Sequence, residues 1–212
     1  MILLAIGTAL MTAADFGVSM VVAPAYLLHL KISEILPFFS FGMSEYTLQA
    51  VLLVLMIVII RKFRATYLFS FITAVIYGVL LDCFLWLLSF IPYILWVRVA
   101  IYGLGLIVVS CGVALMFRTY ISPEAYELFV MEISKKFKLD INKFKILYDL
   151  SSLTIAVLFS FLFFGFGVFR GISWGTVVSA LLNGIVIKFF SSLLNKHFEF
   201  KDKFTWRKFF EK

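Results

Sequence analysis

The chain has 212 residues, of which 63% are hydrophobic and 15% are charged, and its mean hydropathy is +1.07. These values exclude a soluble globular domain and indicate an integral membrane protein. The formal net charge of +7 does not point to nucleic acid, because basic residues of a membrane protein gather where it meets anionic lipid headgroups. We therefore expect a lipid bilayer, and no nucleic acid, as a partner.

The first apolar segment runs from Ile2 to Ala14 and is interrupted by residues 15–17, Asp-Phe-Gly. No basic region precedes it, so we do not recognise a cleavable signal peptide. A short amphipathic piece follows from Pro24. The residues up to 33 therefore form either one span of about 20 residues or a shorter helix followed by a half-helix. The sequence leaves both alternatives open for the segment 18–33.

Five further apolar stretches bring the predicted number of membrane spans to six, and they are Leu48–Ile60, Tyr67–Phe90, Ile94–Phe117, Ile146–Phe166 and Ser173–Lys196. Residues 123–136 form a second short amphipathic piece, which is either a half-helix or part of a longer span. Residues 198–212 form a tail in which basic and aromatic residues alternate. This composition suits a short helix lying in the membrane interface, and a solvated tail is the alternative.

An internal repeat divides the chain into two halves. Phe69–Phe84 aligns with Gly175–Phe190 without a gap, and in both a small residue recurs every four positions, which allows close helix packing in lipid. Shorter matches occur in the same order, namely Ala9-Leu10-Met11 with Ala114-Leu115-Met116, Ala25-Tyr26 with Ala125-Tyr126, and Ile32-Ser33 with Ile133-Ser134. We therefore predict two three-helix repeats, residues 1–90 and residues 91–197.

Basic residues predict the orientation in the membrane. The side that would carry both termini also holds most of the tail, Arg61, Lys62, Arg64, Arg118 and the five lysines from Lys135 to Lys145. The other side holds little beyond Lys31, Arg98 and Arg170. This imbalance predicts a multi-pass protein of the bacterial cytoplasmic (inner) membrane with both termini in the cytoplasm.

The repeat also suggests a mechanism. Each half contains three predicted spans, an odd number, so the second half enters the membrane in the opposite orientation. Such inverted repeats allow a cavity to open first to one face and then to the other. We therefore expect a secondary-transporter-like protein that transports or binds a small molecule. The alternative is a duplication that builds a compact bundle without transport.

Polar residues within apolar segments are the candidate substrate-binding residues. Asp15, Asp82 and Arg98 could converge near the outer side, with Arg98 as the neutralising partner, or form only a structural ion pair. Tyr77 and Asn183 stand beside the paired glycines of the repeat, and their polar groups need partners near mid-helix.

Motifs for catalysis or metal binding are not visible. His29 and His197 are far apart and lack ligand spacing, while Cys83 and Cys111 lie inside apolar segments, as packed thiols do. We find no phosphate loop, nucleophile elbow or paired-cysteine motif. We therefore expect no enzyme activity, no cofactor and no metal.

Several short motifs occur in a characteristic order, namely Asp15-Phe16-Gly17-Val18-Ser19, Ser40-Phe41-Gly42, Gly175-Thr176-Val177 and Asn183-Gly184. Together they resemble the YczE/YitT-like bacterial membrane proteins over most of the chain. The sequence departs from that pattern at Ile185, where a proline is common, and at Ser19-Met20, where Ser-Pro is usual. The resemblance implies a multi-pass inner-membrane protein that exports or imports a small molecule, without an established substrate.

A second class of transport protein stays open. Substrate-capture subunits of energy-coupling-factor vitamin importers also have six helices in about this length, and their first helix resembles the ridge of Ala5, Ala9 and Ala13. Such a subunit would require a membrane partner subunit, whereas a self-sufficient transporter could also form a homodimer. A non-transporting membrane accessory protein is the third class, and it would bind no ligand saturably.

Overall fold

The computed structural model describes residues 1–212 except 65, 91–93, 117–123 and 198–212, and these described residues form eight α-helices and no strand. The helices are α1 (Ile2–Ala13), α2 (Ala23–Ile32), α3 (Phe41–Ile60), α4 (Thr66–Leu88), α5 (Leu95–Met116), α6 (Ala125–Phe137), α7 (Ile141–Phe164) and α8 (Trp174–His197). The predicted all-α class is confirmed for this part of the chain. The predicted interfacial helix in the tail lies outside the described residues.

Five helices of the described chain, α3, α4, α5, α7 and α8, are long and apolar enough to cross a membrane. A helix of 20 residues measures about 30 Å, the thickness of the hydrocarbon core. The protein therefore has the helices of a polytopic membrane protein. The predicted first span is not found at spanning length, because α1 has only 12 residues and measures about 18 Å.

Two helices begin earlier than the hydropathy pattern predicts. Ser40 caps α3 by accepting a hydrogen bond from the Met43 backbone N–H at 3.1 Å, and Asp140 caps α7 by accepting one from the Lys143 N–H at 2.9 Å. Side chains of this kind satisfy backbone donors that the first helical turn leaves unpaired. Because of these caps, both helices begin before their apolar runs, so a prediction from apolar runs places their starts too late.

The segment after α1 is bound to the start of α8. Val18 donates its backbone N–H to the Gly171 carbonyl at 2.9 Å, and Gly175 donates to the Phe16 carbonyl at 2.8 Å. The Thr176 hydroxyl donates to the Val18 carbonyl at 2.8 Å. The Asp-Phe-Gly and Gly-Thr-Val motifs, more than 150 residues apart, therefore form one structural unit.

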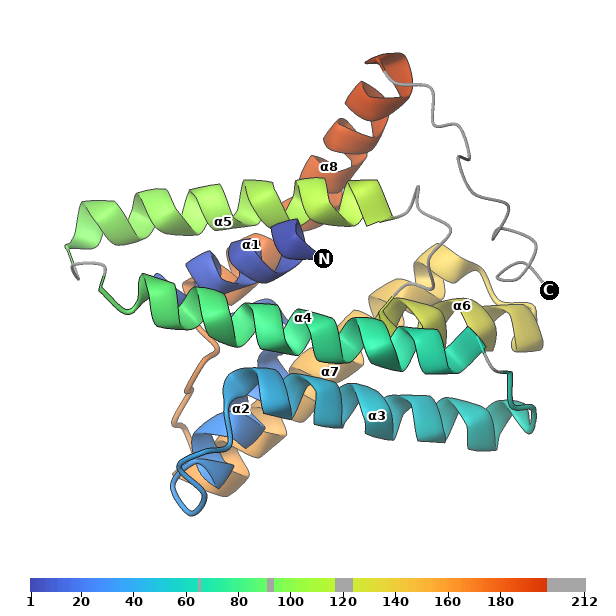
Figure 1. Cartoon of the computed structure of the whole chain (residues 1–212), viewed down its shortest axis with the longest axis horizontal. Coiled ribbons are helices and arrows are strands. Elements are labelled where there is room, and N and C mark those ends of the chain that lie inside the picture. The colour runs from blue at the N-terminus through green and yellow to red at the C-terminus, as the bar shows by residue number, and fades with distance from the viewer. Residues whose placement is uncertain (65, 91–93, 117–123, 198–212) are drawn as a thin grey trace.

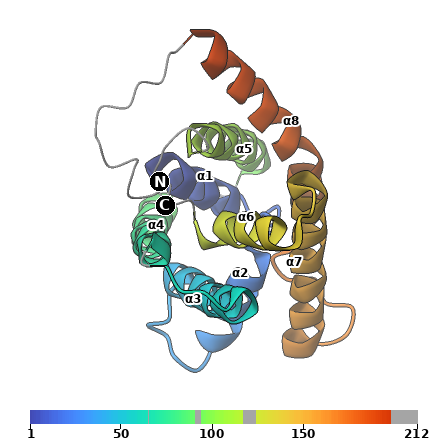
Figure 2. The ribbon, with the colours of Figure 1, turned by 90° about the vertical axis from the view of Figure 1, so that its right-hand side faces the viewer.

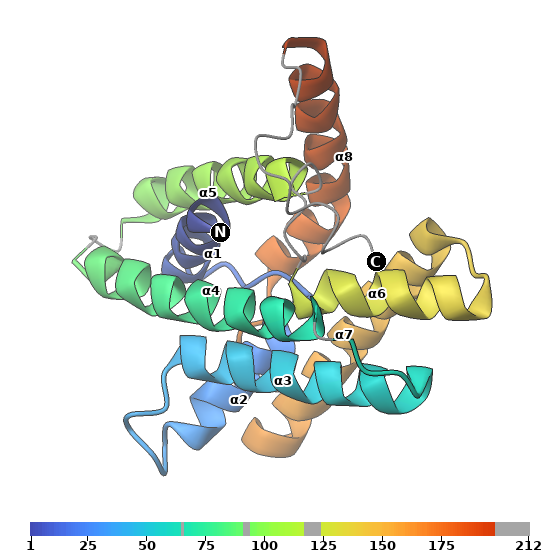
Figure 3. The same ribbon diagram turned by 45° about the vertical axis from the view of Figure 1, so that its right-hand side comes forward.

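The long helices do not all share one direction. α3, α4 and α5 run along a common direction (Figure 1), so that all three are seen nearly end-on in the view turned by 90° (Figure 2). In that second view α7 and α8 are seen from the side. α8 projects away from α7 (Figure 3).

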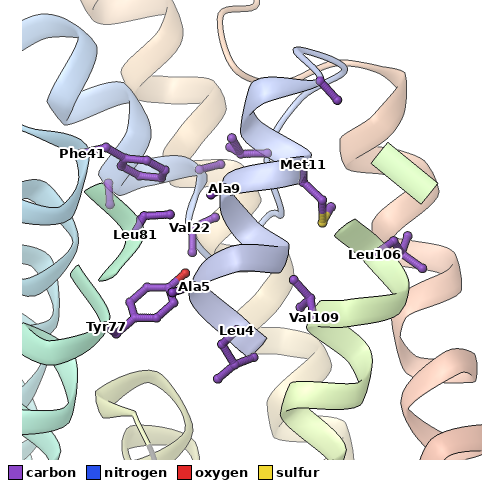
Figure 4. Close-up of a cluster of buried hydrophobic side chains, with 14 of the residues drawn as sticks. Leu4, Ala5, Ala9, Met11, Val22, Phe41, Tyr77, Leu81, Leu106 and Val109 are labelled. Carbon is purple, nitrogen blue, oxygen red and sulfur yellow. The ribbon is translucent and has the colours of Figure 1, made fainter. Parts of the chain in front are cut away.

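α1 forms the centre of the packing. It lies between α4, which contributes Tyr77 and Leu81, and α5 (Figure 4). Ala5 and Ala9 are completely buried. The first two residues of the alanine ridge thus pack inside the chain itself.

The two halves pack their helices in corresponding ways. When each helix is replaced by its counterpart in the other half (α1 and α5, α2 and α6, α3 and α7, α4 and α8), a packed pair usually gives another packed pair. α1 packs on α4 as α5 packs on α8, α2 packs on α7 as α6 packs on α3, and α2 packs on α3 as α6 packs on α7. The main exception among the described helices is that α3 packs along α4, whereas α7 does not pack along α8.

The paired glycines of the repeat have opposite surroundings. Gly78 of α4 faces Gly42 of α3, and a Cβ atom added to Gly78 would lie 2.6 Å from the Gly42 carbonyl oxygen. At its counterpart, Gly184 of α8, an added Cβ atom would meet no described atom within 4 Å. At this pair of positions, glycine is therefore required for close approach in the first half only.

We expect Gly78→Ala to lower the thermal unfolding temperature of the detergent-purified protein. The added methyl group would press on backbone atoms of α3, and overpacking of this kind costs about 1–3 kcal/mol. Gly184→Ala is the matched control and should leave the temperature unchanged or raise it, because alanine favours a helix by about 1 kcal/mol over glycine. Equal losses in the two variants would contradict the packing described above.

Candidate functional site

A cavity of about 690 Å³ lies between the two halves of the chain. Its walls come from α1, α5, α7 and α8, with residues 19–22, the start of α6 and Tyr77 of α4. Leu4, Met11, Val109 and Leu153 are among the apolar lining residues. A volume of about 300–1,000 Å³ with mostly apolar walls and a few polar groups is typical of small-molecule sites.

Charged groups gather at one end of this cavity. Lys145 of α7 lies between two carboxylates, with its Nζ atom 2.8 Å from Glu127 Oε1 and 3.1 Å from Asp149 Oδ1. Lys145 and Asp149 are four residues apart and share one face of α7. Glu124, which precedes α6, also lines the cavity. Three carboxyl groups thus face one ammonium group, an arrangement that favours a cationic ligand group or a proton.

Glu124 is the carboxyl group that the lysine does not contact. Its Oε1 atom is buried and has no hydrogen-bond partner in the described part of the chain. Burial, together with the nearby charge of Glu127, raises the pKa of Glu124 from its ordinary value of 4.5 to about 7. This carboxyl group therefore exchanges its proton near neutral pH.

Two of the five predicted site residues line the cavity. Tyr77 donates its hydroxyl to Thr8 Oγ1 at 2.9 Å. Asn183 accepts a hydrogen bond from the Ser110 hydroxyl at 2.7 Å. The mid-helix polar groups of these two residues thus have the partners that the sequence analysis required of them.

Asp15 and Arg98 meet at the end of α1, away from the described cavity lining. Arg98 Nη2 lies 3.1 Å from Asp15 Oδ2, and Arg98 Nε donates to the Ala14 carbonyl at 2.7 Å. The guanidinium also lies 4.9 Å from the ring centroid of Phe16. Because the Asp15 side chain is 74% exposed, this geometry matches the structural ion pair that the sequence analysis gave as the alternative.

Asp82 contacts α3. Its carboxylate accepts hydrogen bonds from the Ser40 hydroxyl at 2.5 Å and from the Gly42 N–H at 2.8 Å. A carboxylate is favourable there, because the helix N-terminus carries unpaired N–H groups and a partial positive charge. Asp82 thus fastens α4 to the start of α3, and it is absent from the described lining of the cavity.

Sequence reasoning missed the charged end of the cavity. Glu124, Glu127 and Asp149 stand near helix ends, where a solvated carboxylate is the default expectation. The packing of α6 against α7 covers them instead. A usable signal was the spacing of Lys145 and Asp149, four residues apart at the start of an apolar helix.

Groups of three or more His, Cys, Asp or Glu side chains that could hold a metal ion do not occur among the described residues. His29 Nδ1 lies 2.8 Å from the Phe39 carbonyl oxygen. Cys83 is exposed and Cys111 is half-buried, and both are free thiols. Cys83 therefore differs from the packed thiol expected, because its position on α4 faces outward.

Comparison with known proteins gives a family model that matches residues 1–192 and is described as a family of unknown function, DUF6198. No curated protein and no solved structure matches the chain. The resemblance to the YczE/YitT-like proteins stays a prediction.

We expect Glu124→Gln to gain stability relative to the wild type as the pH rises from 4.5 to 7. A carboxyl group whose pKa is raised by folding holds its proton more tightly in the folded state, so its contribution to stability falls through this pH range. Melting temperatures measured across the range test this. Glu34→Gln, at an exposed position, is the control, and a pH profile of Glu124→Gln parallel to that of the wild type would contradict the expectation.

Proposed function

We propose that the chain, which belongs to the DUF6198 family of unknown function, transports a small molecule across a membrane as a secondary-transporter-like protein. The observation that carries the proposal is the cavity of about 690 Å³, which takes its walls from both halves of the chain and its charged groups from α6 and α7. Spanning helices around a cavity that contains ionisable groups are typical of transporters.

Alternating access between inverted repeats is the mechanism we propose. This mechanism is supported by the corresponding packing of helices in the two halves. The main exception to this correspondence supports it as well, because α3 packs along α4, whereas α7 and α8 do not pack along each other and both line the cavity. On this proposal, the first half is closed and the second half is open.

Closure of the second half would bring α8 onto α7, as α4 lies on α3. Lys188 stands at the position of Asp82 in the repeat alignment, and both Lys188 and Asp140 are exposed. Asp140 caps α7 as Ser40 caps α3. In the closed arrangement Lys188 would therefore approach Asp140. Lys188 and Asp140 would form an ion pair at the place where Asp82 and Ser40 form a hydrogen bond in the first half.

The lining indicates the class of ligand. The excess of carboxyl groups over ammonium groups at one end favours a ligand with an amino or other cationic group, and the remaining apolar walls favour a hydrocarbon portion. We therefore propose a small organic cation as the substrate.

We expect a panel of small organic amines to include a compound that raises the melting temperature of the detergent-purified protein. A ligand that binds only the native state stabilises it by about 2.7 kcal/mol at one hundred times its Kd. Glu124→Gln and Asn183→Ala should reduce the shift, while Asp15→Asn, outside the cavity lining, should retain it. Equal shifts in all three variants would place the site elsewhere, and the absence of any stabilising compound would favour a non-transporting accessory protein.

We expect α7 and α8 to populate a second, shorter separation in lipid nanodiscs. Spin labels at Leu158 and Ile185, both exposed, would report it in a variant without the two native cysteines. Gly184→Leu should reduce the population of the shorter distance, because a bulky side chain prevents close approach of α8. Labels at Val54 of α3 and Val79 of α4 monitor the other half. A single long α7–α8 distance that Gly184→Leu does not alter would contradict alternating access.

A further inference from the structure

Glu45 of α3 is a carboxyl group enclosed by the protein. Its side chain is completely buried. Its Oε2 atom accepts hydrogen bonds from the Tyr126 hydroxyl at 2.9 Å and from Gln49 Nε2 at 3.4 Å, while Oε1 has no partner among the described residues. Within that part of the chain, no lysine, arginine or histidine forms an ion pair with Glu45.

The described residues around Glu45 offer no compensating charge. The titratable groups that interact with it are Tyr77 of α4, Glu124 and Tyr126 at the start of α6, and Tyr148 of α7, none of which is a cation. Burying a carboxylate without a counter-ion is costly, so such a group takes up a proton instead.

A short route joins Glu45 to the cavity. Tyr126 and Glu124 both line the cavity, while the Tyr126 hydroxyl contacts Glu45 directly. Gln49, one turn after Glu45, accepts a hydrogen bond from the Ala125 N–H at 3.2 Å. The pair Glu45 and Gln49 thus fastens the start of α6 to α3, and a negative charge on Glu45 would repel Glu124 and weaken this contact.

We propose that Glu45 holds a proton in this conformation and that this proton is the coupling ion of transport, exchanged with the cavity through Glu124. The protonation stands on the geometry alone, whereas the coupling rests on the proposed transport function. On release, the proton leaves the Glu45 carboxyl group for the Glu124 carboxylate and then for the cavity. Glu45 becomes a buried anion that no described cation neutralises, which favours an arrangement of α3 and α6 that admits water.

Infrared difference spectroscopy of the protein in nanodiscs tests the protonation. The wild type should show the C=O stretch of a protonated carboxyl group at neutral pH, and Glu45→Gln should lose this band while Glu34→Gln keeps it. Tyr126→Phe removes the hydrogen bond to Glu45 and should shift the band without abolishing it, which keeps the test decisive if Glu45→Gln folds poorly. A band that neither variant alters overturns the proposal.

The coupling is tested with the labels on α7 and α8. In the wild type the population of the shorter distance should change as the pH crosses neutrality, and in Glu45→Gln it should not. An unchanged pH dependence in Glu45→Gln overturns the coupling. If the shorter distance is absent at every pH, the proposal of alternating access is wrong, and the coupling is overturned with it. The infrared band still decides whether Glu45 holds a proton.

Discussion

The close contact of small residues on α1 with its neighbours is the constraint on which the rest of the structure depends. Helices in lipid gain little from hydrophobic burial, so their association relies on close packing. Ala5 and Ala9 are completely buried, and Gly7 meets the backbone of Gly105 and Val109 on α5. α1 then ends after 12 residues. The chain turns, and residues 19–22 form a wall of the cavity.

The polar groups of the interior fall into two kinds. Arg98 and Asp82 have hydrogen-bond partners and hold helix ends in place, at the end of α1 and at the start of α3. Glu45 and Glu124 each keep one buried oxygen without a partner in the described residues. Buried polar atoms almost always have partners, so the unpartnered oxygen atoms of these two carboxyl groups require an explanation. A bound proton and a second conformation together provide one.

Much of the fold follows from hydropathy alone, because a run of about 20 apolar residues has few other stable arrangements. The all-α class and the long apolar helices were predicted in this way. The starts of α3 and α7 were not, because they depend on the caps Ser40 and Asp140. The charged end of the cavity was missed because it forms only when α6 packs on α7. The alignment of the two repeats also could not show that Gly78 and Gly184 have different surroundings.

The difference between Asp82 and Lys188 explains why the two halves need not behave alike. Asp82 binds a helix N-terminus, whose unpaired N–H groups and partial positive charge attract a carboxylate. Lys188 would be repelled by the same end of α7 if Asp140 were absent. On the proposed mechanism, docking of α8 would therefore depend on one exposed carboxylate that also caps its own helix. Such a contact is weaker and reversible, so on the proposed mechanism the first half is the scaffold and α8 is the element that moves.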